Sequence, residues 1–225
     1  MAEVTALVPM RHASERVPGK NFRPLAGRPL FHWVLDMLLS CPVVGDVVVD
    51  TDSNVIRDDA ARNFPSVRLL RRPAHLCGGD VAMNDVLANT LAQLPGELFL
   101  QTHATNPLLR ADTVARAVEL FVAGRPGHDS LFGVTRRHVR LWDAAGRPLN
   151  HDPAVLLRTQ DLPPVFEENS CLYLFSRDVF IARVNRLGAR PLMFEIDAEE
   201  ALDVDEEFDF AVAESLVARR LGHGG

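Results

Sequence analysis

Lysine is almost absent from this sequence. Lys20 is the only lysine among the 24 lysine and arginine residues of the 225-residue chain. Acidic residues outnumber basic ones, and the net charge of −6 argues against a general nucleic-acid or membrane-surface binder, because such proteins usually carry a basic surplus. No apolar run reaches the ~20 residues that a membrane helix needs. We therefore expect neither nucleic acid nor a membrane as a partner.

Cysteine is also scarce, and two common phosphate-binding motifs are missing. Cys41, Cys77 and Cys171 are odd in number and widely spaced, which fits neither a disulfide framework nor a zinc site and favours a reducing cytoplasm. The first ten residues have no basic region followed by a long apolar core, so we expect no signal peptide. Neither GxxxxGK[ST] nor GxGxxG occurs, which excludes a Walker loop and a dinucleotide fingerprint.

What the sequence does contain is an alternation of short apolar runs and helical periodicity. Hydrophobic residues make up 47% of the chain, enough for one large domain over residues 1–225. Strands are predicted at 4–8, 47–49, 67–70, 98–101 and 131–135, and helices at 30–39, 54–63, 84–94 and 112–122. The strands are apolar throughout, which predicts an α/β fold whose parallel sheet is covered by helices on both faces.

The alternation breaks after residue 135. Residues 136–170 are rich in arginine, proline and turn residues and predict an excursion of hairpins and loops. Regular structure is expected again in a strand at 171–175, a helix near 178–184, a strand at 192–196 and a last helix at about 206–220.

The loop that follows the first predicted strand reads MRHASERVPGKN at 10–21. It carries Arg11, Ser14, Arg16 and Lys20 against one acid, Glu15. Ligands of open α/β sheets bind beyond the carboxyl ends of the strands, and backbone N–H groups, a hydroxyl and cations together suit a polyphosphate. A solvated basic loop is the alternative. The single lysine favours function, because a compact ammonium on a flexible stem can reach one phosphate oxygen in a crowded loop.

The segment LDVD at 202–205 places Asp203 and Asp205 two residues apart. On an extended segment this spacing points both carboxylates to the same side, and two carboxylates with nucleotide phosphates are a usual way to hold Mg²⁺. Capping of the last helix is the alternative, and Glu206, Glu207 and Asp209 favour its N-terminus.

Two further stretches are weaker signals. VFEENSCLYLF at 165–175 holds Asn169 and the only tyrosine, Tyr173, which alone is better explained as a core residue. QTHATNPLLR at 101–110 is a polar segment at the end of a strand and contains His103. An ordinary βα turn explains it equally well.

Taken in order, these stretches resemble the acylneuraminate cytidylyltransferases, or CMP-sialic acid synthetases, and their relatives that act on other keto-deoxy sugar acids. The resemblance covers nearly the whole chain. Its motifs are the loop with Arg11, Ser14, Pro18, Lys20 and Asn21, then DTDS at 50–53, RRPAHL at 71–76, QDLPPVFEENSCLYLF at 160–175 and LDVD at 202–205.

The resemblance implies a Rossmann-like nucleotidyltransferase fold of three layers, in which 136–170 forms a dimerisation and substrate arm of a homodimer. It implies that CTP and a nonulosonic, sialic-acid-like sugar acid give the CMP-sugar and pyrophosphate, for cell-surface glycan biosynthesis.

The resemblance also implies roles for individual residues. Lys20, Arg11 and Asp205 would be catalytic, and Mg²⁺ would lie on Asp203 and Asp205. The residues implied in nucleotide binding are Arg11, Ser14, Arg16, Lys20, Asn21, Arg72 and Asn84. Those implied in sugar binding are His103, Arg158, Gln160, Asn169 and Tyr173, and Arg158 could pair with the sugar carboxylate.

The chain departs from the family pattern at three positions. The family usually has a lysine close to the serine that corresponds to Ser14, whereas this chain has Glu15 there. His103 replaces a glutamine, and Ser170 replaces a glycine. Two other hypotheses therefore stay open. One is a nucleotidyltransferase for a phosphorylated or shorter acceptor, and the other is a nucleotide-binding module without catalysis, for which Glu15 is the best support.

Overall fold

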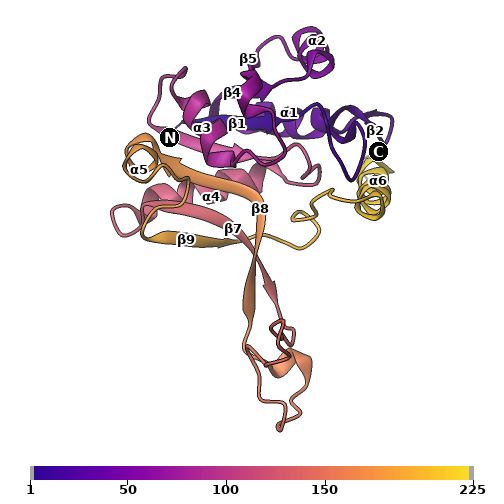
Figure 1. Ribbon diagram of the computed structural model, residues 1–225, viewed down its shortest axis with the longest axis vertical. Helices are drawn as coiled ribbons and strands as arrows, with labels where there is room; N and C mark the ends of the chain where they lie inside the picture. The colour runs from indigo at the N-terminus through magenta and orange to yellow at the C-terminus, as the bar shows by residue number, and fades with distance from the viewer. Residues whose placement is uncertain (1–2, 223–225) are drawn as a thin grey trace.

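The computed structural model describes residues 3–222 and has a seven-stranded sheet at its centre (Figure 1). The strand order is β5-β4-β1-β6-β8-β7-β9. Its strands are β1 (Val4–Met10), β4 (Val44–Thr51), β5 (Arg68–Arg71), β6 (Leu98–Thr102), β7 (Ser130–Arg137), β8 (Val165–Ser176) and β9 (Pro191–Glu195). β8 runs antiparallel to β6 and β7, whereas the other neighbouring pairs are parallel. The predicted, mainly parallel α/β sheet is confirmed.

Helices cover both faces of this sheet. The helices are α1 (Leu30–Ser40), α2 (Asn54–Asn63), α3 (Met83–Leu91), α4 (Ala111–Gly124), α5 (Arg177–Arg183) and α6 (Glu207–Gly222). Residues of α1, α2 and α4 pack with Ala6, Val8 and Leu100 in one buried cluster. Residues of α3 and α5 pack with Leu7 and Phe99 in another. Successive strand residues thus point to opposite faces, and both faces are buried, which gives the three expected layers.

The last helix packs at one end of the molecule rather than on the sheet. α6 buries Phe210, Ala213 and Val217 against Leu25 and Leu30, beside the small antiparallel pair β2 (Pro24–Leu25) and β3 (Arg28–Pro29). Asp209 receives hydrogen bonds from the backbone N–H groups of Asp205 and Glu206 at 3.0 and 2.8 Å. The acidic stretch therefore caps this helix, as the composition indicated.

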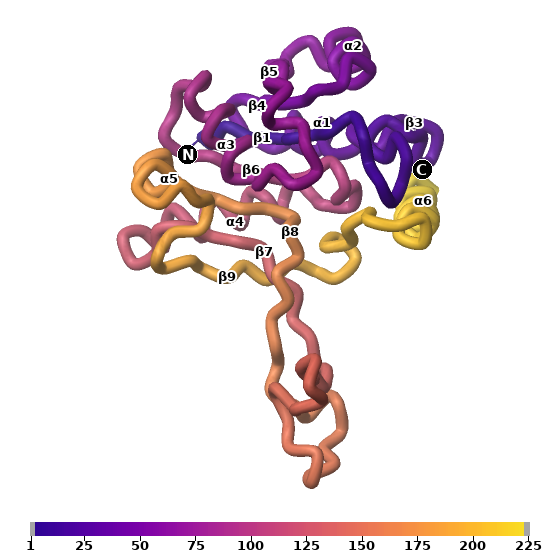
Figure 2. Tube along the Cα trace, in the orientation of Figure 1, coloured from indigo at the N-terminus to yellow at the C-terminus, as the bar shows by residue number. Residues whose placement is uncertain are grey.

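A two-stranded arm projects from the body (Figures 1 and 2). β7 and β8 continue past the sheet and pair as far as Arg137 and Val165, and Arg137 forms an ion pair with Glu167 across the ribbon at 2.9 Å. Residues 138–164 form the outer part, which includes the short helix η3 (Thr159–Asp161). The ends of the expected excursion, 136–137 and 165–170, thus belong to strands β7 and β8.

Smaller differences concern the ends of elements. α2 begins at Asn54 as predicted, with the Ser53 hydroxyl accepting from the N–H of Ile56 at 3.3 Å. α3 ends at Leu91 and α4 begins at Ala111, because termini depend on local contacts more than on periodicity. No helix within residues 3–222 is long and apolar enough to cross a membrane.

Candidate active site

A cavity of about 550 Å³ lies beyond the carboxyl ends of β1 and β6, where an open α/β sheet is expected to hold its ligand. Its wall comes from the loop after β1, the segments after β5 and β6, Ser170 of β8, and the loop that precedes α6. The charged side chains on this wall are Arg11, Arg16, Lys20, Arg72 and Arg186, against Glu15, Asp203 and Asp205. This surplus of cations suits an anionic ligand.

The loop after β1 is held in place by its own backbone and by neighbouring loops. Gly19 has φ +66°, and a Cβ there would lie 2.9 Å from the ring of Phe22, so glycine fits the turn that places Lys20 at the start of a short 3₁₀ helix. Asn21 donates its side-chain N–H to the carbonyl of Arg11 at 2.9 Å. Arg11 and Asn21 therefore come together on the cavity wall, as the motif suggested.

Lys20 reaches across the cavity to the loop before α6. Its Nζ donates to the carbonyl of Val204 at 2.6 Å and to the Asp205 carboxylate at 3.1 Å. The side chain is only 11% exposed, so the ammonium is fixed among oxygens in a narrow space. A planar guanidinium is longer and wider than an ammonium, so we expect arginine to fit this position less well than lysine.

Asp203 and Asp205 both line the cavity, and the same-side placement of their carboxylates stays a prediction. Burial works to raise the pKa of the Asp205 carboxyl, but Lys20 and Arg16 outweigh it and lower that pKa. Arg16 lies 2.9 Å from the same carboxylate. Burial raises the pKa of the Asp203 carboxyl, and among the described residues its Oδ1 is buried with no hydrogen-bond partner.

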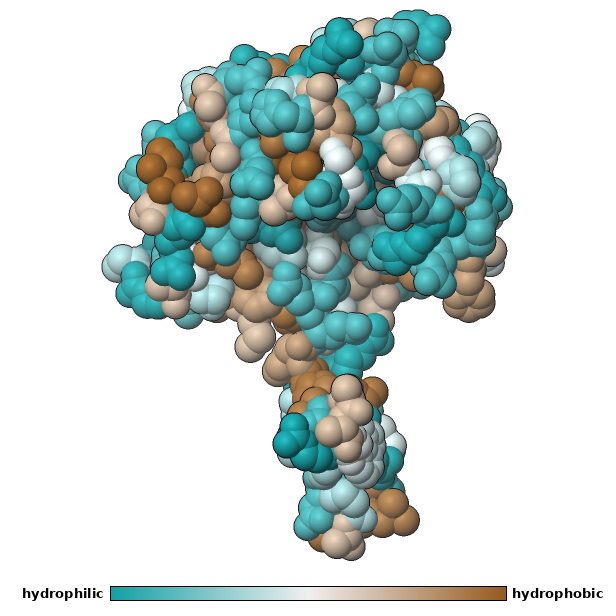
Figure 3. Space-filling view, viewed as in Figure 1, coloured by the Kyte–Doolittle hydropathy of each residue, from teal (hydrophilic) through white to brown (hydrophobic). Residues whose placement is uncertain are grey.

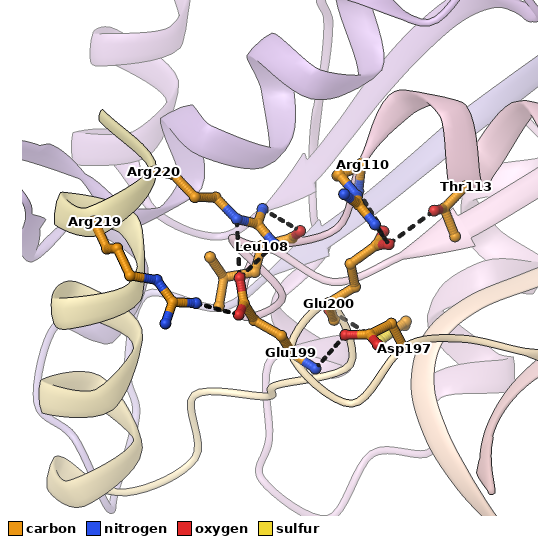
Figure 4. Close-up of polar contacts among 9 residues, drawn as sticks. Leu108, Arg110, Thr113, Asp197, Glu199, Glu200, Arg219 and Arg220 are labelled. Atoms are coloured by element: carbon orange, nitrogen blue, oxygen red, sulfur yellow. Dashed lines mark hydrogen bonds and ion pairs between the residues drawn. The ribbon is translucent and has the colours of Figure 1, made fainter. Parts of the chain in front are cut away.

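Two glutamates anchor the loop that carries these aspartates (Figure 4). Glu200 is 1% exposed and accepts from the backbone N–H of Arg110 at 3.0 Å, from its guanidinium and from the hydroxyl of Thr113. Glu199 forms ion pairs with Arg219 and Arg220 of α6. The loop is thereby tied to the first turn of α4 on one side and to α6 on the other, which fixes the backbone ahead of Asp203.

Arg72 lies on the cavity wall, but its guanidinium is already bound. It pairs with Asp50 at 2.5 Å, with side chains 2% and 3% exposed, and donates to the Asp50 carbonyl at 3.1 Å. The hydroxyl of Thr90 donates to the other Asp50 oxygen at 2.9 Å. This buried ion pair ties β4 to the segment after β5, so its visible role is to support the wall. The nucleotide contact expected of Arg72 stays a prediction.

On the β6 and β8 side of the cavity, neutral and cationic groups form a chain of hydrogen bonds. The guanidinium of Arg186 donates to Oε1 of Gln101, and Nε2 of Gln101 lies 2.9 Å from Nε2 of His103. Gln101 must donate its amide N–H to His103, because its oxygen already accepts from Arg186. His103 thus accepts at Nε2 and carries its proton at Nδ1.

His103 stays uncharged at neutral pH for electrostatic reasons. Burial, and then the positive charges of Arg186 and Lys20, lower its pKa to about 4 against the weaker opposite effect of Asp205. A neutral imidazole that donates at one nitrogen and accepts at the other offers the same two hydrogen-bonding functions as a glutamine side chain.

Tyr173 and Ser170 complete this side. Tyr173 is fully buried, and the guanidinium of Arg186 lies over its ring, 3.5 Å from the centroid. Its hydroxyl contacts Glu168 and, at 3.3 Å, the hydroxyl of Ser170. Ser170 has φ +56° in an irregular part of the β7–β8 ladder, a left-handed conformation that favours glycine.

The other expected sugar-binding and nucleotide-binding residues lie outside the cavity wall of this chain. Asn169 is held by Thr135 at 3.1 Å, and Asn84 receives the backbone N–H of Arg186 at 3.4 Å. Arg158 and Gln160 lie on the arm, where Arg158 pairs with Asp161 at 2.6 Å. The roles expected of these residues stay predictions, as does the role of Tyr173 in sugar binding.

Comparisons with known proteins agree with this geometry. A family model described as cytidylyltransferase matches residues 5–218. The chain belongs to the cytidylyltransferase family. This confirms the resemblance seen in the motifs.

Three relatives illustrate the range of similarity to this cytidylyltransferase chain. The N-acylneuraminate cytidylyltransferase of Oncorhynchus mykiss is 30% identical over 227 residues, 96% of this chain and 50% of that protein. The 3-deoxy-manno-octulosonate cytidylyltransferase of Acaryochloris marina is 29% identical over 199 residues, 84% of this chain and 79% of that protein. The solved structure of a CMP:2-keto-3-deoxy-manno-octonic acid synthetase complexed with CTP superposes with a TM-score of 0.74 at 16% identity, covering 97% of this chain and 100% of that chain.

These likenesses differ in what they show. The superposition confirms the fold. The chain spans about half the length of the first curated relatives it matches.

Two residues of the candidate site were not expected from the sequence. Arg186 follows α5 in a stretch without a motif, and Gln101 lies on β6 and is fully buried. The only signal for Gln101 is a buried amide inside an apolar strand, which demands partners. No local signal singles out Arg186 from the other arginines.

Proposed function

We propose that the protein activates a nonulosonic, sialic-acid-like sugar acid with CTP, releasing pyrophosphate and forming the CMP-sugar. The anomeric hydroxyl would attack the α-phosphate, and the bond from the α-phosphate to the departing pyrophosphate would break. The observation that carries this proposal is one cavity whose wall holds the cations of the loop after β1 together with Asp203 and Asp205, and Arg16 and Lys20 pair with Asp205 there. A solved CMP:2-keto-3-deoxy-manno-octonic acid synthetase complexed with CTP has the same fold, and the chain is related in sequence to N-acylneuraminate and 3-deoxy-manno-octulosonate cytidylyltransferases.

The cations of the loop after β1 would bind the triphosphate. Arg11 is exposed and reaches toward the Gly78 carbonyl at 3.5 Å, so it can turn to a phosphate at little cost. Lys20 and Arg16 both contact Asp205 in the structure. Fixed positive charge near the α-phosphate would offset the negative charge that builds up there and on pyrophosphate in the transition state.

The carboxylates fit a magnesium ion. Asp203 lines the cavity, and its Oδ1 is a buried acceptor with no hydrogen-bond partner among the described residues; such an atom is costly unless it is satisfied. Asp203 and Asp205 would hold Mg²⁺ together with phosphate oxygens, as is usual for this ion. When bound, Mg²⁺ would orient the phosphates and acidify the attacking hydroxyl.

Glu15 is the remaining difficulty for a triphosphate. It is exposed on the cavity wall, and a Cβ at Gly79 would lie 3.3 Å from its carboxylate and 3.5 Å from the guanidinium of Arg11. Both side chains thus face the same glycine, and the Arg11 charge moderates the repulsion that Glu15 would exert on phosphates. This arrangement favours an active enzyme over a module that has lost catalysis.

We also propose a homodimer in which the arm of one copy completes the cavity of the other. The outer part of the arm exposes apolar side chains, among them Leu156 at 90% and Leu149 at 63%, and hydrophobic colour lies on its surface (Figure 3). Such side chains standing away from the body suit burial against a second copy. Pairing would bring Arg158 and Gln160 to a site that they do not reach within their own chain.

The three thiols are consistent with the cytoplasmic location that we propose. Cys41, Cys77 and Cys171 are all unpaired, and two of them are buried. Burial, opposed by backbone hydrogen bonds, raises the pKa of the Cys41 thiol, which keeps it protonated and unreactive.

Pyrophosphate release tests the activity. The purified protein is incubated with CTP, Mg²⁺ and each of a panel of sialic, legionaminic, pseudaminic and shorter keto-deoxy sugar acids, with UTP and sugar 1-phosphates as controls. We expect release that depends on CTP and on one or more of the acids. Release only with a phosphorylated acceptor would favour the other nucleotidyltransferase, and CTP binding without any turnover would favour a binding module.

Subunit mixing tests the shared site. Arg158→Ala and Lys20→Ala proteins are assayed separately and after exchange of subunits. If the arm serves the neighbouring cavity, the mixture regains activity, because one of its two sites is intact. Separate monomers in light scattering, or no recovery on mixing, would contradict the shared site.

A further inference from the structure

Arg186 is a cation on the cavity wall that forms no ion pair with the described residues. Of the other cations on the cavity wall, Arg16 and Lys20 pair with Asp205, and Arg72 pairs with Asp50. None of the ion pairs within residues 3–222 involves Arg186. Its guanidinium is partly buried, and burial lowers its pKa. Glu168 favours the charged form of Arg186, but burial outweighs it. A buried charge without an ion pair is costly, so this position is explained best by a ligand that brings the opposite charge.

The surrounding residues fix the guanidinium rather than neutralise it. The ring of Tyr173 supports one face at 3.5 Å, Nη1 donates to Gln101, and Asn84 holds the backbone N–H of Arg186 at 3.4 Å. Tyr173 is fully buried, as is Gln101. A guanidinium held on one face and at one nitrogen keeps its other N–H groups available in a rigid fork.

This group lies apart from the loop that carries the phosphate-binding cations. In the sheet, β6 separates β1 from β8. The loop after β1 provides Lys20, whereas Arg186 is bonded to Gln101 of β6 and packed on Tyr173 of β8. The remaining polar groups on this side of the wall are the neutral His103 and the Ser170 hydroxyl. A single guanidinium beside two neutral groups matches one carboxylate better than a triphosphate.

We propose that Arg186 binds the carboxylate of the acceptor sugar acid and selects acids over neutral sugars, with Nδ1–H of His103 and the Ser170 hydroxyl as neutral hydrogen-bonding groups beside it. The proposal rests on the proposed function. It assigns to a residue of the same chain the role that the sequence suggested for Arg158, which lies on the arm and pairs with Asp161.

A comparison of two acceptors tests this assignment. Initial rates are measured for the wild type and for Arg186→Gln with the most active sugar acid of the panel and with its C1 carboxamide. Loss of a hydrogen-bonded charge pair costs the wild type about 10- to 100-fold in kcat/KM when the carboxamide replaces the acid. Arg186→Gln is expected to lose a similar factor with the acid and to lose little more with the carboxamide, while its KM for CTP stays the same.

Controls separate the possible failures. Thermal melting and CTP binding show whether Arg186→Gln is folded. Arg186→Lys keeps a charge without the fork and is expected to raise the acid's KM about tenfold. Arg62→Ala, an exposed arginine of α2, is the matched control. A folded Arg186 variant that still prefers the acid as the wild type does, or that loses CTP binding, overturns the proposal. Absence of turnover in the wild type would instead refute the proposed function.

Discussion

His103 offers a pH-dependent test of the site that requires no substrate. Its imidazole accepts from Gln101 at Nε2, and burial together with the charges of Arg186 and Lys20 lowers its pKa from 6.5 to about 4. In the unfolded chain this imidazole would regain its ordinary pKa. As pH falls, the unfolded state therefore takes up a proton before the folded state does, and folding loses free energy.

The size of the effect follows from this pKa shift. Each unit of pKa corresponds to about 1.4 kcal/mol, so a shift from 6.5 to about 4 contributes up to about 3 kcal/mol. The contribution is fully present above the unfolded pKa of 6.5. It declines as pH falls from 6.5 toward 4, and it is lost below the folded pKa.

The assay is denaturant unfolding of the wild type and of His103→Gln at several pH values between about 7.5 and 4.5. Glutamine can accept from Gln101 but does not titrate, so the difference between the two proteins isolates His103 from every other titrating group. We expect the wild type to lose stability relative to the variant as pH falls below 6.5, by up to about 3 kcal/mol. Parallel curves for the two proteins would show that His103 has an ordinary pKa and would refute the electrostatic reasoning.

Three further substitutions test other parts of the site. Asp205→Asn is expected to weaken the Mg²⁺ dependence of turnover, and an unchanged Mg²⁺ titration would remove Asp205 from the metal site. Ser170→Gly should raise the free energy of unfolding by about 1 kcal/mol, because glycine adopts the φ of +56° without steric strain. Calorimetry would detect this as a melting temperature about 2–4 °C higher. An equal or lower melting temperature would contradict the strain. Arg72→Met leaves the buried Asp50 without its ion-pair partner and should lower the free energy of unfolding, measured with denaturant, by about 3–5 kcal/mol. Wild-type stability with a raised KM for CTP would instead show that Arg72 binds the ligand directly.

The fold could be predicted from the sequence because its signals are local and repeated. The apolar runs of β1, β4, β5 and β6 are short, and each is followed by a helical segment before the next strand. The orientation of β8 was harder to foresee, since an apolar strand reads the same in either direction. The extent of β8 into the arm was missed because residues 167–170 are polar and none of residues 165–170 is buried, so that only pairing with β7 makes them a strand.

The site was predictable where one motif holds its parts together. Lys20 and Arg11 share a loop, and Asp203 and Asp205 share an extended segment, so their side chains were expected on one wall. Partners distant in sequence could not be foreseen in the same way. Lys20 meets Asp205 across 185 residues, and Arg186 meets Gln101 across 85. Such contacts arise only from the packing of the sheet, which no local pattern encodes.

The most direct measurement of the central claim is the turnover of Lys20→Arg. This substitution keeps the positive charge but replaces a compact ammonium that lies 2.6 Å from the Val204 carbonyl and is only 11% exposed. Pyrophosphate release from CTP and the best sugar acid is compared with that of the wild type and of Arg62→Ala, with melting curves to confirm folding. We expect Lys20→Arg to stay folded and to lose most of its turnover, as Lys20→Ala does. Activity close to that of the wild type would contradict the role of Lys20 in binding the triphosphate.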